Sequence, residues 1–263
     1  MTIFFAVLIV TLTGLIGAGI LVLAAQFMHV DEDERIGIVL EALPGANCGA
    51  CGYAGCADYA KAIAEGAPVN KCVPGGANTA NAVGIIMGVE AGEVAKRKAI
   101  VLCQGNYDHT TDKYDYNGIA SCKACAALYS GSSACEFGCL GFGDCKDACK
   151  FGAIEVENGL SRVNPELCTG CGACVEACPK HIISLRVESE KPVVLCANHA
   201  RGALTRKACT AGCIGCKKCE KACPTQAITV VDNVAFIDHE KCIGCRVCVS
   251  ECPVHAITIP KIV

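Results

Sequence analysis

The sequence predicts an α+β protein with one N-terminal transmembrane helix, a small four-cysteine domain and two tandem modules built on cysteine repeats. Three observations lead to this fold class. Residues 3–28 carry no charge, a first cysteine group has the spacing C-x2-C-x4-C-x15-C, and the pattern C-x2-C-x2-C-x3-C-P recurs toward the C-terminus. The chain has 263 residues, enough for about two or three small domains.

The first predicted element is a membrane-spanning helix over residues 1–28. The 26 uncharged residues from Ile3 to Met28 would form a helix of roughly 39 Å, which exceeds the ~30 Å hydrocarbon core of a bilayer. A cleaved signal peptide, the alternative, would have a basic n-region and a shorter apolar core, and this segment has neither. We therefore expect this helix to span a membrane.

The 25 cysteines approach a tenth of the residues, a level typical of either a disulfide scaffold or a metal scaffold. Disulfide-dense domains have irregular cysteine spacing, whereas tight C-x2-C-x2-C runs place several thiolates around one metal site. None of the six His has zinc-finger spacing. The chain has no Trp and few other aromatic residues, so inorganic clusters would also stabilise a fold with a small core. These features favour iron–sulfur clusters.

The second predicted element is a small iron–sulfur domain over residues 29–98. Its motif PGANCGACGYAGC contains glycines that let the backbone fold tightly and turn N–H groups toward cluster sulfurs. A zinc site is the alternative, but its usual layout is two C-x-x-C knuckles. We expect a short helix from Asp58 to Gly66 and a longer one from Thr79 to Lys98. The predicted ligands are Cys48, Cys51, Cys56 and Cys72.

An internal repeat predicts the rest of the fold. Three segments have the bacterial ferredoxin spacing C-x2-C-x2-C-x3-C-P, and the last two are offset by 29 residues. In such runs the fourth cysteine binds the other cluster of a pair, so two runs share one small module. The three copies are CTGCGACVEACP from Cys168, CIGCKKCEKACP from Cys213 and CIGCRVCVSECP from Cys242.

A fourth copy with altered spacing precedes these three. It reads C-x3-C-x5-C-x3-C, and its last two cysteines lie 29 residues before the last two of the Cys168 run. The tail KFGAIEV that follows it matches PTQAITV after Cys223. Lys150 replaces the usual Pro and adds a positive charge beside a cluster, which would slightly favour the reduced state. The cysteines of this copy are Cys135, Cys139, Cys145 and Cys149.

The four runs predict two-cluster ferredoxin modules over residues 135–184 and 211–263, with connecting segments at 99–134 and 185–210. Exchanging the fourth cysteines within each module gives four ligand sets, so with the first domain we expect five [4Fe–4S] clusters on twenty cysteines. Zinc fits poorly, since three of the four runs end in C-P. The sets are Cys135, Cys139, Cys145 and Cys178; Cys168, Cys171, Cys174 and Cys149; Cys213, Cys216, Cys219 and Cys252; and Cys242, Cys245, Cys248 and Cys223.

Five cysteines lie outside these sets. Two belong to a fainter repeat, IVLC and VVLC, in which each copy predicts a strand before its ferredoxin-type unit. Free cysteine is a common small buried hydrophobe, so we expect packing as the role of the five, with a sixth cluster as the alternative. They are Cys103, Cys122, Cys125, Cys196 and Cys209.

The spanning helix, the acidic residues after it, the NCGACGYAGC motif and the ferredoxin-type runs together resemble the B subunit of the Rnf complex over the whole chain, and the stretched CEFGCLGFGDCKDAC run resembles the clostridial type. The resemblance implies an electron-transfer subunit of a membrane enzyme that couples electron flow from reduced ferredoxin to NAD⁺ with export of Na⁺ or H⁺. It implies soluble ferredoxin and the integral and NAD- or flavin-binding Rnf subunits as partners. The cluster ligands carry over position by position, with Lys150 as the departure.

The chemistry expected of this chain is electron relay alone. The Gly-Phe-Gly segment at 141–143 lies inside a ligand loop and lacks the strand–loop–helix context of a dinucleotide site, so we expect no flavin or nicotinamide on this chain. We also expect no nucleic acid as a partner. The spanning helix has no ionisable residue to bind the exported ion. Because reduced thiolates and iron clusters persist most easily in the cytosol, we expect a single pass of the plasma membrane with the N-terminus outside and the cluster domains cytoplasmic.

A basic segment predicts where ferredoxin docks. Residues 201–221 contain six Lys or Arg against Glu220 alone, which would steer an acidic partner, although a solvated surface that offsets cluster charge is the alternative. Two other function classes stay open. One is a membrane-tethered polyferredoxin of another dehydrogenase, and the other is a cluster-bearing membrane sensor, which would normally carry an output domain where only eleven residues follow Cys252.

Overall fold

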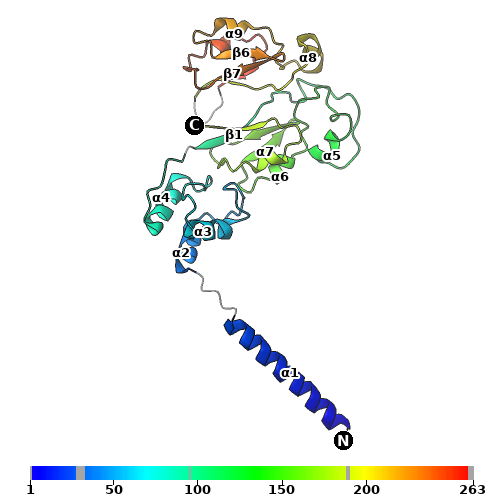
Figure 1. Ribbon diagram of the computed structural model, residues 1–263. Coiled ribbons are helices and arrows are strands. Elements are labelled where there is room, and N and C mark those ends of the chain that lie inside the picture. The colour runs from blue at the N-terminus through cyan, green and yellow to red at the C-terminus, as the bar shows by residue number, and fades with distance from the viewer. Residues whose placement is uncertain (1, 28–32, 95, 188–189, 260–263) are drawn as a thin grey trace.

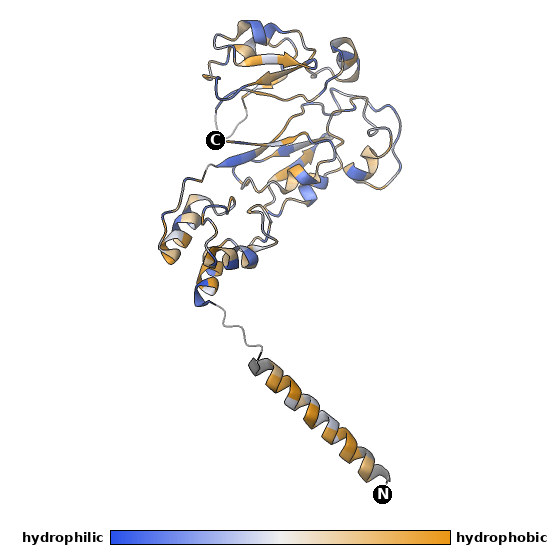
Figure 2. Cartoon of the chain, viewed as in Figure 1, coloured by the Kyte–Doolittle hydropathy of each residue, from blue (hydrophilic) through white to orange (hydrophobic). Residues whose placement is uncertain are grey.

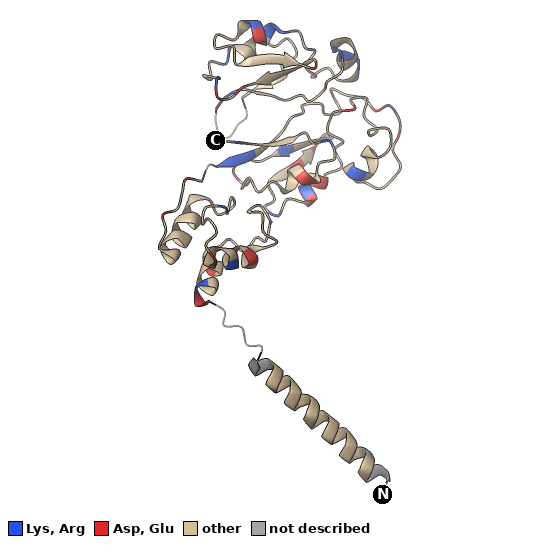
Figure 3. Cartoon of the chain, viewed as in Figure 1, with Lys and Arg blue, Asp and Glu red and all other residues tan. Residues whose placement is uncertain are grey.

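The computed structural model describes residues 2–27, 33–94, 96–187 and 190–259 (Figure 1). Its first element, α1 (Thr2–Phe27), is a continuous 26-residue helix that is apolar along its length and free of charge (Figures 2 and 3). The stretch Val7–Ala24 has a mean hydropathy of 2.6, and none of it is buried against the rest of the described chain. α1 is therefore long and apolar enough to cross a membrane, although Met1 and Met28 of the predicted helix lie outside the described residues.

Three helices form a small domain after α1, and their buried side chains make one core. The helix predicted from Asp58 overlaps the second of them. The helix predicted from Thr79 to Lys98 is wrong in its second half: Gly88 adopts a left-handed conformation with φ of 68°, and the N–H of Val89 donates to the Gly84 carbonyl at 2.9 Å, which closes the helix. The helices are α2 (Glu34–Ala42), α3 (Cys56–Ala64) and α4 (Gly76–Met87).

The first ferredoxin-type module is built on two antiparallel strand pairs, β1 with β4 and β2 with β3. Arg97 pairs with Val187 and Val101 with Ile183, so β1 packs in this module, although residues up to 98 were predicted to belong to the four-cysteine domain and residues 99–134 to a connecting segment. Buried residues of these strands, among them Ala99, Val101 and Ile154, pack with the cysteines in one core. The elements are β1 (Arg97–Val101), α5 (Cys122–Ala126), α6 (Asp144–Asp147), β2 (Ile154–Glu157), β3 (Leu160–Val163), α7 (Ala173–Ala177) and β4 (Ile183–Val187).

The second module repeats this plan. β5 pairs with β8, and β6 forms a hairpin with β7 in which Ile228 faces Ile237. The strands predicted before each module, β1 and β5, are thus confirmed. The residue after each strand makes an equivalent backbone hydrogen bond. The N–H of Leu102 donates to the Ile182 carbonyl at 2.7 Å, and the N–H of Leu195 donates to the Ala256 carbonyl at 2.8 Å. The elements are β5 (Val193–Val194), α8 (Gly202–Ala208), α9 (Lys218–Ala222), β6 (Ile228–Val231), β7 (Val234–Ile237), α10 (Val247–Ser250) and β8 (Ile257–Thr258).

Polar contacts join the three cysteine-bearing parts. Lys150 Nζ of the first module donates to the carbonyl oxygens of Ala46 and Asn47 in the helical domain, at 3.1 and 2.9 Å. Between the modules, Thr110 forms an isolated β-bridge with Cys209. The Thr110 hydroxyl also donates to the Ala208 carbonyl at 2.9 Å. The segment 99–134, predicted as a connection, is therefore integrated into the packing of both modules.

Candidate iron–sulfur sites

The cysteines of the helical domain gather around one centre. Burial raises the pKa of the Cys72 thiol, and Cys56, Cys51 and Cys48 are close enough to raise it further, so the four thiols predicted together do lie together. Asn47 shapes the loop, since its Oδ1 accepts a hydrogen bond from the N–H of Cys56 at 2.8 Å.

The wall beside these four thiols is made by Tyr59, which is only 1% exposed. Its hydroxyl donates to the Pro68 carbonyl at 2.8 Å and accepts from the Lys71 N–H at 3.0 Å, just before Cys72. The ring stacks on Tyr53 with 5.2 Å between centroids. This one side chain therefore ties both ends of the ligand loop to α3.

In the second module both predicted sets come together within one core. Burial raises the pKa of Cys219 to about 11, with Cys213, Cys252 and Cys216 as the neighbouring thiols. Burial likewise raises the pKa of Cys248 to about 11, with Cys242, Cys245 and Cys223 beside it. The fourth cysteine of each run thus lies with the first three of the other run. The first of these sets lines a cavity of about 330 Å³, including its opening.

In the first module the set from the Cys168 run also assembles as predicted. Cys149, Cys168, Cys171 and Cys174 line a cavity of about 310 Å³. Burial raises the pKa of Cys174 to about 12, so the thiol is neutral without metal, and loading a cluster releases its proton. The N–H of Ala99 on β1 donates to Cys168 Sγ at 3.4 Å.

The remaining predicted set needs a correction. A cavity of about 340 Å³ in the first module is lined by Cys139, Cys145 and Cys178 as expected, but its fourth cysteine is Cys122. Cys135 lines a different cavity, between the modules. Cys139 and Cys145 also share a partner, since their thiols donate to Ser161 Oγ at 3.7 and 3.2 Å.

One position of the repeat explains why Cys122 rather than Cys135 lies with these cysteines. When Cys139 is aligned with Cys213, Cys145 falls on Cys219 and Phe142 falls on Cys216, so this run lacks its middle ligand. Cys122 lies at the missing place. Burial raises the pKa of its thiol, and the backbone N–H groups of Phe142 and Gly143 act against that rise. The spacing within the runs did not predict Cys122 in this group, and the gap at Phe142 indicates only that a cysteine from outside the run completes it.

Asp144 holds Cys122 in this position. Its carboxylate accepts hydrogen bonds from the N–H groups of Cys122 at 2.7 Å and Lys123 at 2.9 Å, and from the Ser121 hydroxyl at 2.9 Å. These contacts connect the first turn of α5 to the residue before Cys145.

The ligand loops fit an iron–sulfur cluster in two further ways. First, the residue two positions before the third cysteine of each run adopts a left-handed backbone conformation, which turns N–H groups inward. Second, backbone N–H groups donate to ligand sulfurs at 3.3–3.4 Å, as hydrogen bonds that tune a cluster do. The left-handed residues are Gly143 (φ 92°), Gly172 (φ 86°), Lys217 (φ 59°) and Arg246 (φ 67°). The altered fourth copy therefore has the same turn as the regular three.

Three family models match these sites. A model described as "Putative Fe-S cluster" matches residues 43–74, which contain the Cys48–Cys72 site. A "4Fe-4S binding domain" matches residues 161–184, and a "4Fe-4S dicluster domain" matches residues 212–256, which contain both sites of the second module. Iron–sulfur binding is thus supported in all three parts.

Curated relatives match most of the chain. The B subunit of a Na⁺-translocating ferredoxin:NAD⁺ oxidoreductase complex from Acetobacterium woodii is 48% identical over 84% of this chain and 67% of the relative. The B subunit of an ion-translocating oxidoreductase complex from Methanosarcina acetivorans is 45% identical over 90% of this chain and 92% of the relative. The chain belongs to the family of Rnf B subunits.

A third member of this family, from the proton-translocating ferredoxin:NAD⁺ oxidoreductase complex of Clostridium ljungdahlii, is 38% identical over 90% of this chain and 84% of the relative. The predicted function is confirmed at this level: the chain is an iron–sulfur electron-transfer subunit of an ion-translocating oxidoreductase. The apolar α1 agrees with membrane association.

Proposed function

We propose that this chain accepts electrons from a reduced ferredoxin and passes them to the membrane-embedded and NAD-reducing subunits of its complex. Bound [4Fe–4S] clusters supply the one-electron chemistry. The observation that carries the proposal is the grouping of buried thiols in fours, with N–H donors aimed at their sulfurs, in three contiguous parts of the chain.

Five clusters are held by twenty cysteines, with Cys122 in the place first expected for Cys135. We assign residues 99–134 to the first module for the same reason. The proposed sets are Cys48, Cys51, Cys56 and Cys72; Cys122, Cys139, Cys145 and Cys178; Cys149, Cys168, Cys171 and Cys174; Cys213, Cys216, Cys219 and Cys252; and Cys223, Cys242, Cys245 and Cys248.

In this proposal α1 anchors the chain as a single span of the plasma membrane, with the N-terminus outside and the cluster domains in the cytoplasm. The uncharged exposed surface of α1 supports insertion in lipid. Reduced thiolates and iron–sulfur clusters persist most easily in the cytosol, which supports the cytoplasmic placement of the cysteine-bearing domains.

The direct test mixes the purified holo-chain, prepared anaerobically, with reduced ferredoxin. We expect its visible charge-transfer absorption to bleach without added flavin or nicotinamide. Bleaching by dithionite but not by ferredoxin would exclude ferredoxin as the donor. A protein that holds zinc and has no visible absorption would overturn the iron–sulfur assignment itself.

The proposed docking surface for ferredoxin consists of exposed Lys and Arg residues at α8 and α9, two helices on which Figure 3 marks these residue types in blue. Its six cations are exposed, and the only salt bridge among them in the described residues is the 4.0 Å contact of Lys217 with Glu220. The surface covers a cluster site, because the Gly202 backbone at the start of α8 packs against the Ile214 carbonyl in the Cys213 loop. The cations are Arg201, Arg206, Lys207, Lys217, Lys218 and Lys221.

Replacing Lys217, Lys218 and Lys221 with Gln should lower the second-order rate of reduction by ferredoxin by roughly tenfold at low salt. The remaining rate should depend less on ionic strength, since exposed charges are screened within about 8 Å at physiological salt. Stopped-flow mixing over a range of salt concentrations measures both effects. Dithionite should still reduce every cluster in the variant.

The matched control replaces three exposed cations of the first module, Lys123, Lys146 and Arg162, with Gln. The net charge changes equally in the two triple variants, so only a local docking effect distinguishes them. Equal rates for the two would place the docking site elsewhere, with the Cys48–Cys72 domain as the next candidate.

A further inference from the structure

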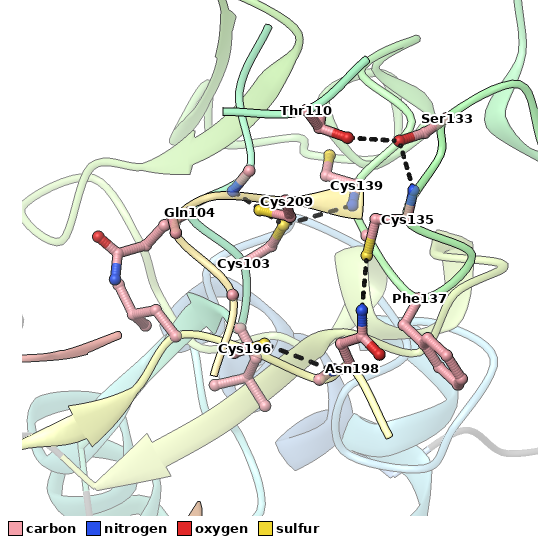
Figure 4. A pocket seen from close by; sticks show the side chains of 17 residues that line it. Cys103, Gln104, Thr110, Ser133, Cys135, Phe137, Cys139, Cys196, Asn198 and Cys209 are labelled. Carbon is pink, nitrogen blue, oxygen red and sulfur yellow. Dashed lines mark hydrogen bonds between the residues drawn. The ribbon is translucent and has the colours of Figure 1, made fainter. Parts of the chain in front are cut away.

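A cavity between the two modules is lined by four cysteines that the predicted ligand sets do not bring together (Figure 4). It has about 390 Å³ of empty space including its opening, close to the 310, 340 and 330 Å³ of the three cluster cavities above. Cys139 also contributes to its wall, but the Cys139 thiol donates a hydrogen bond to the Ser161 hydroxyl in the neighbouring site. The four cysteines are Cys103, Cys135, Cys196 and Cys209.

The two halves of the chain contribute equivalent pairs to this cavity. Cys103 and Cys196 occupy the same position after Val-Leu at the ends of β1 and β5. Cys135 and Cys209 each begin a C-x-x-G-C segment, CEFGC and CTAGC, whose last cysteine is the first ligand of a ferredoxin-type run. A repeat of two cysteines per module thus becomes a group of four where the modules meet.

Hydrogen bonds to the sulfurs follow the same two-fold pattern. Cys103 Sγ accepts from the N–H of Gly105 at 3.4 Å and from that of Cys139 at 3.5 Å. Cys196 Sγ accepts from Asn198 at 3.5 Å and from Cys213 at 3.2 Å. In each case the donors are the residue two places on and the first ligand of the adjacent run. Paired N–H donors of this kind stabilise thiolates bound to a cluster.

Two further contacts aim the other sulfurs inward. Asn198, only 3% exposed, donates its Nδ2–H to Cys135 Sγ at 3.5 Å. A Cβ atom on Gly105 would lie 3.2 Å from Cys209 Sγ and 3.7 Å from Cys103 Sγ, so these two sulfurs face one point, as Figure 4 shows. The Ser133 hydroxyl accepts from the Cys135 N–H at 3.3 Å and contacts Thr110, the β-bridge partner of Cys209.

Cys125 shows what a packing cysteine looks like in the same protein. It is fully buried, its thiol donates to Ser132 Oγ at 3.8 Å, and it packs with Leu140 rather than facing a cavity shared with other thiols. The four thiols at the junction instead surround a cavity whose empty volume, including its opening, is close to those of the proposed cluster sites.

We propose that Cys103, Cys135, Cys196 and Cys209 hold a sixth [4Fe–4S] cluster at the junction of the two modules. The proposal rests on the proposed function, because it takes the five other clusters as bound. It gives the junction a redox centre between the two pairs of ferredoxin-type sites and leaves Cys125 as the only packing cysteine among the 25.

Iron and acid-labile sulfide per chain test the sixth site on the full, anaerobically purified protein. Four iron atoms per cluster predict about 24 in the wild type, about 20 in Cys103→Ala/Cys196→Ala and about 24 in the matched control Cys125→Ala. About 20 in both wild type and double variant would overturn the proposal. Zinc that disappears in the double variant would replace it with a zinc site. A wild-type value far below 20 would instead overturn the five-cluster proposal, and the difference of four would still decide the sixth site.

A variant that keeps all ligands provides a second readout. Asn198→Asp retains the carbonyl-type oxygen that accepts the Ala200 N–H at 2.7 Å but removes the donor to Cys135. In an anaerobic redox titration followed by electron paramagnetic resonance, we expect one cluster to shift to a lower potential at unchanged iron content, since loss of an N–H···S bond disfavours the reduced state. Six unshifted potentials, or five clusters that titrate as in the wild type, would count against the site.

Discussion

A Cys122→Ala variant is expected to lose one cluster of the first module, about four iron atoms per chain, although Cys122 stands outside every ferredoxin-type run. The reason is that Cys122 lines the cavity with Cys139, Cys145 and Cys178, at the place left open by Phe142. An alanine there leaves three thiolates for four irons. Iron analysis and the visible absorption of the anaerobic protein measure the loss.

A second substitution separates ligation from packing. Phe142→Cys restores the regular C-x2-C-x2-C spacing of the run, so Cys122→Ala/Phe142→Cys should recover part of the lost iron. Cys125→Ala, one turn further along α5 at a cysteine that is also buried, should lose none. Full iron content in Cys122→Ala, or no recovery in a soluble, folded double variant, would return Cys122 to a packing role.

Within the two modules, the predicted ligand sets that the structure brings together are those whose first three members lie in regular C-x2-C-x2-C runs. Spacing alone brings Cys213, Cys216 and Cys219 to one loop, and the exchange of Cys223 with Cys252 follows from the two-fold plan of the module. Cys122 could not be placed by spacing, because its position depends on how α5 docks on Asp144. Whether a thiol is buried among other thiols depends on the tertiary fold. The spacing of a run that lacks one cysteine therefore does not identify which distant cysteine takes its place.

Two other differences between the predicted and the observed structure also have local causes. Gly84 and Gly88 lie in a stretch of apolar residues that favours a helix through Lys98, and the sequence does not show that Gly88 will become the left-handed cap. At Lys150, the charge beside a cluster was predicted, but the position of the ammonium group was not. Its bonds to Ala46 and Asn47 connect the residue after Cys149 to the residue before Cys48, and therefore two cluster loops of different domains.

The modular plan gives the second large effect: Cys219→Ala is expected to remove about eight iron atoms, both clusters of the second module, rather than four. Cys219 and Cys248 belong to different sites but to one small core with Ile228, Ile237 and Ile257. A module with two short strand pairs and no large aromatic core depends on metal ligation for its stability, so opening one site should unfold the loops of the other.

The effect should stop within that module. Additivity holds between distant sites, so the Cys48–Cys72 site and the two sites inside the first module should keep their iron. Cys51→Ala is the matched control, because it opens the single site of the helical domain and should remove about four iron atoms and no more. Iron content and the pattern of cluster signals in electron paramagnetic resonance distinguish the two variants. Equal loss from every site after Cys219→Ala would mean that the three parts fold as one cooperative unit, and a loss of only four would mean that each ferredoxin-type loop is stable without its partner.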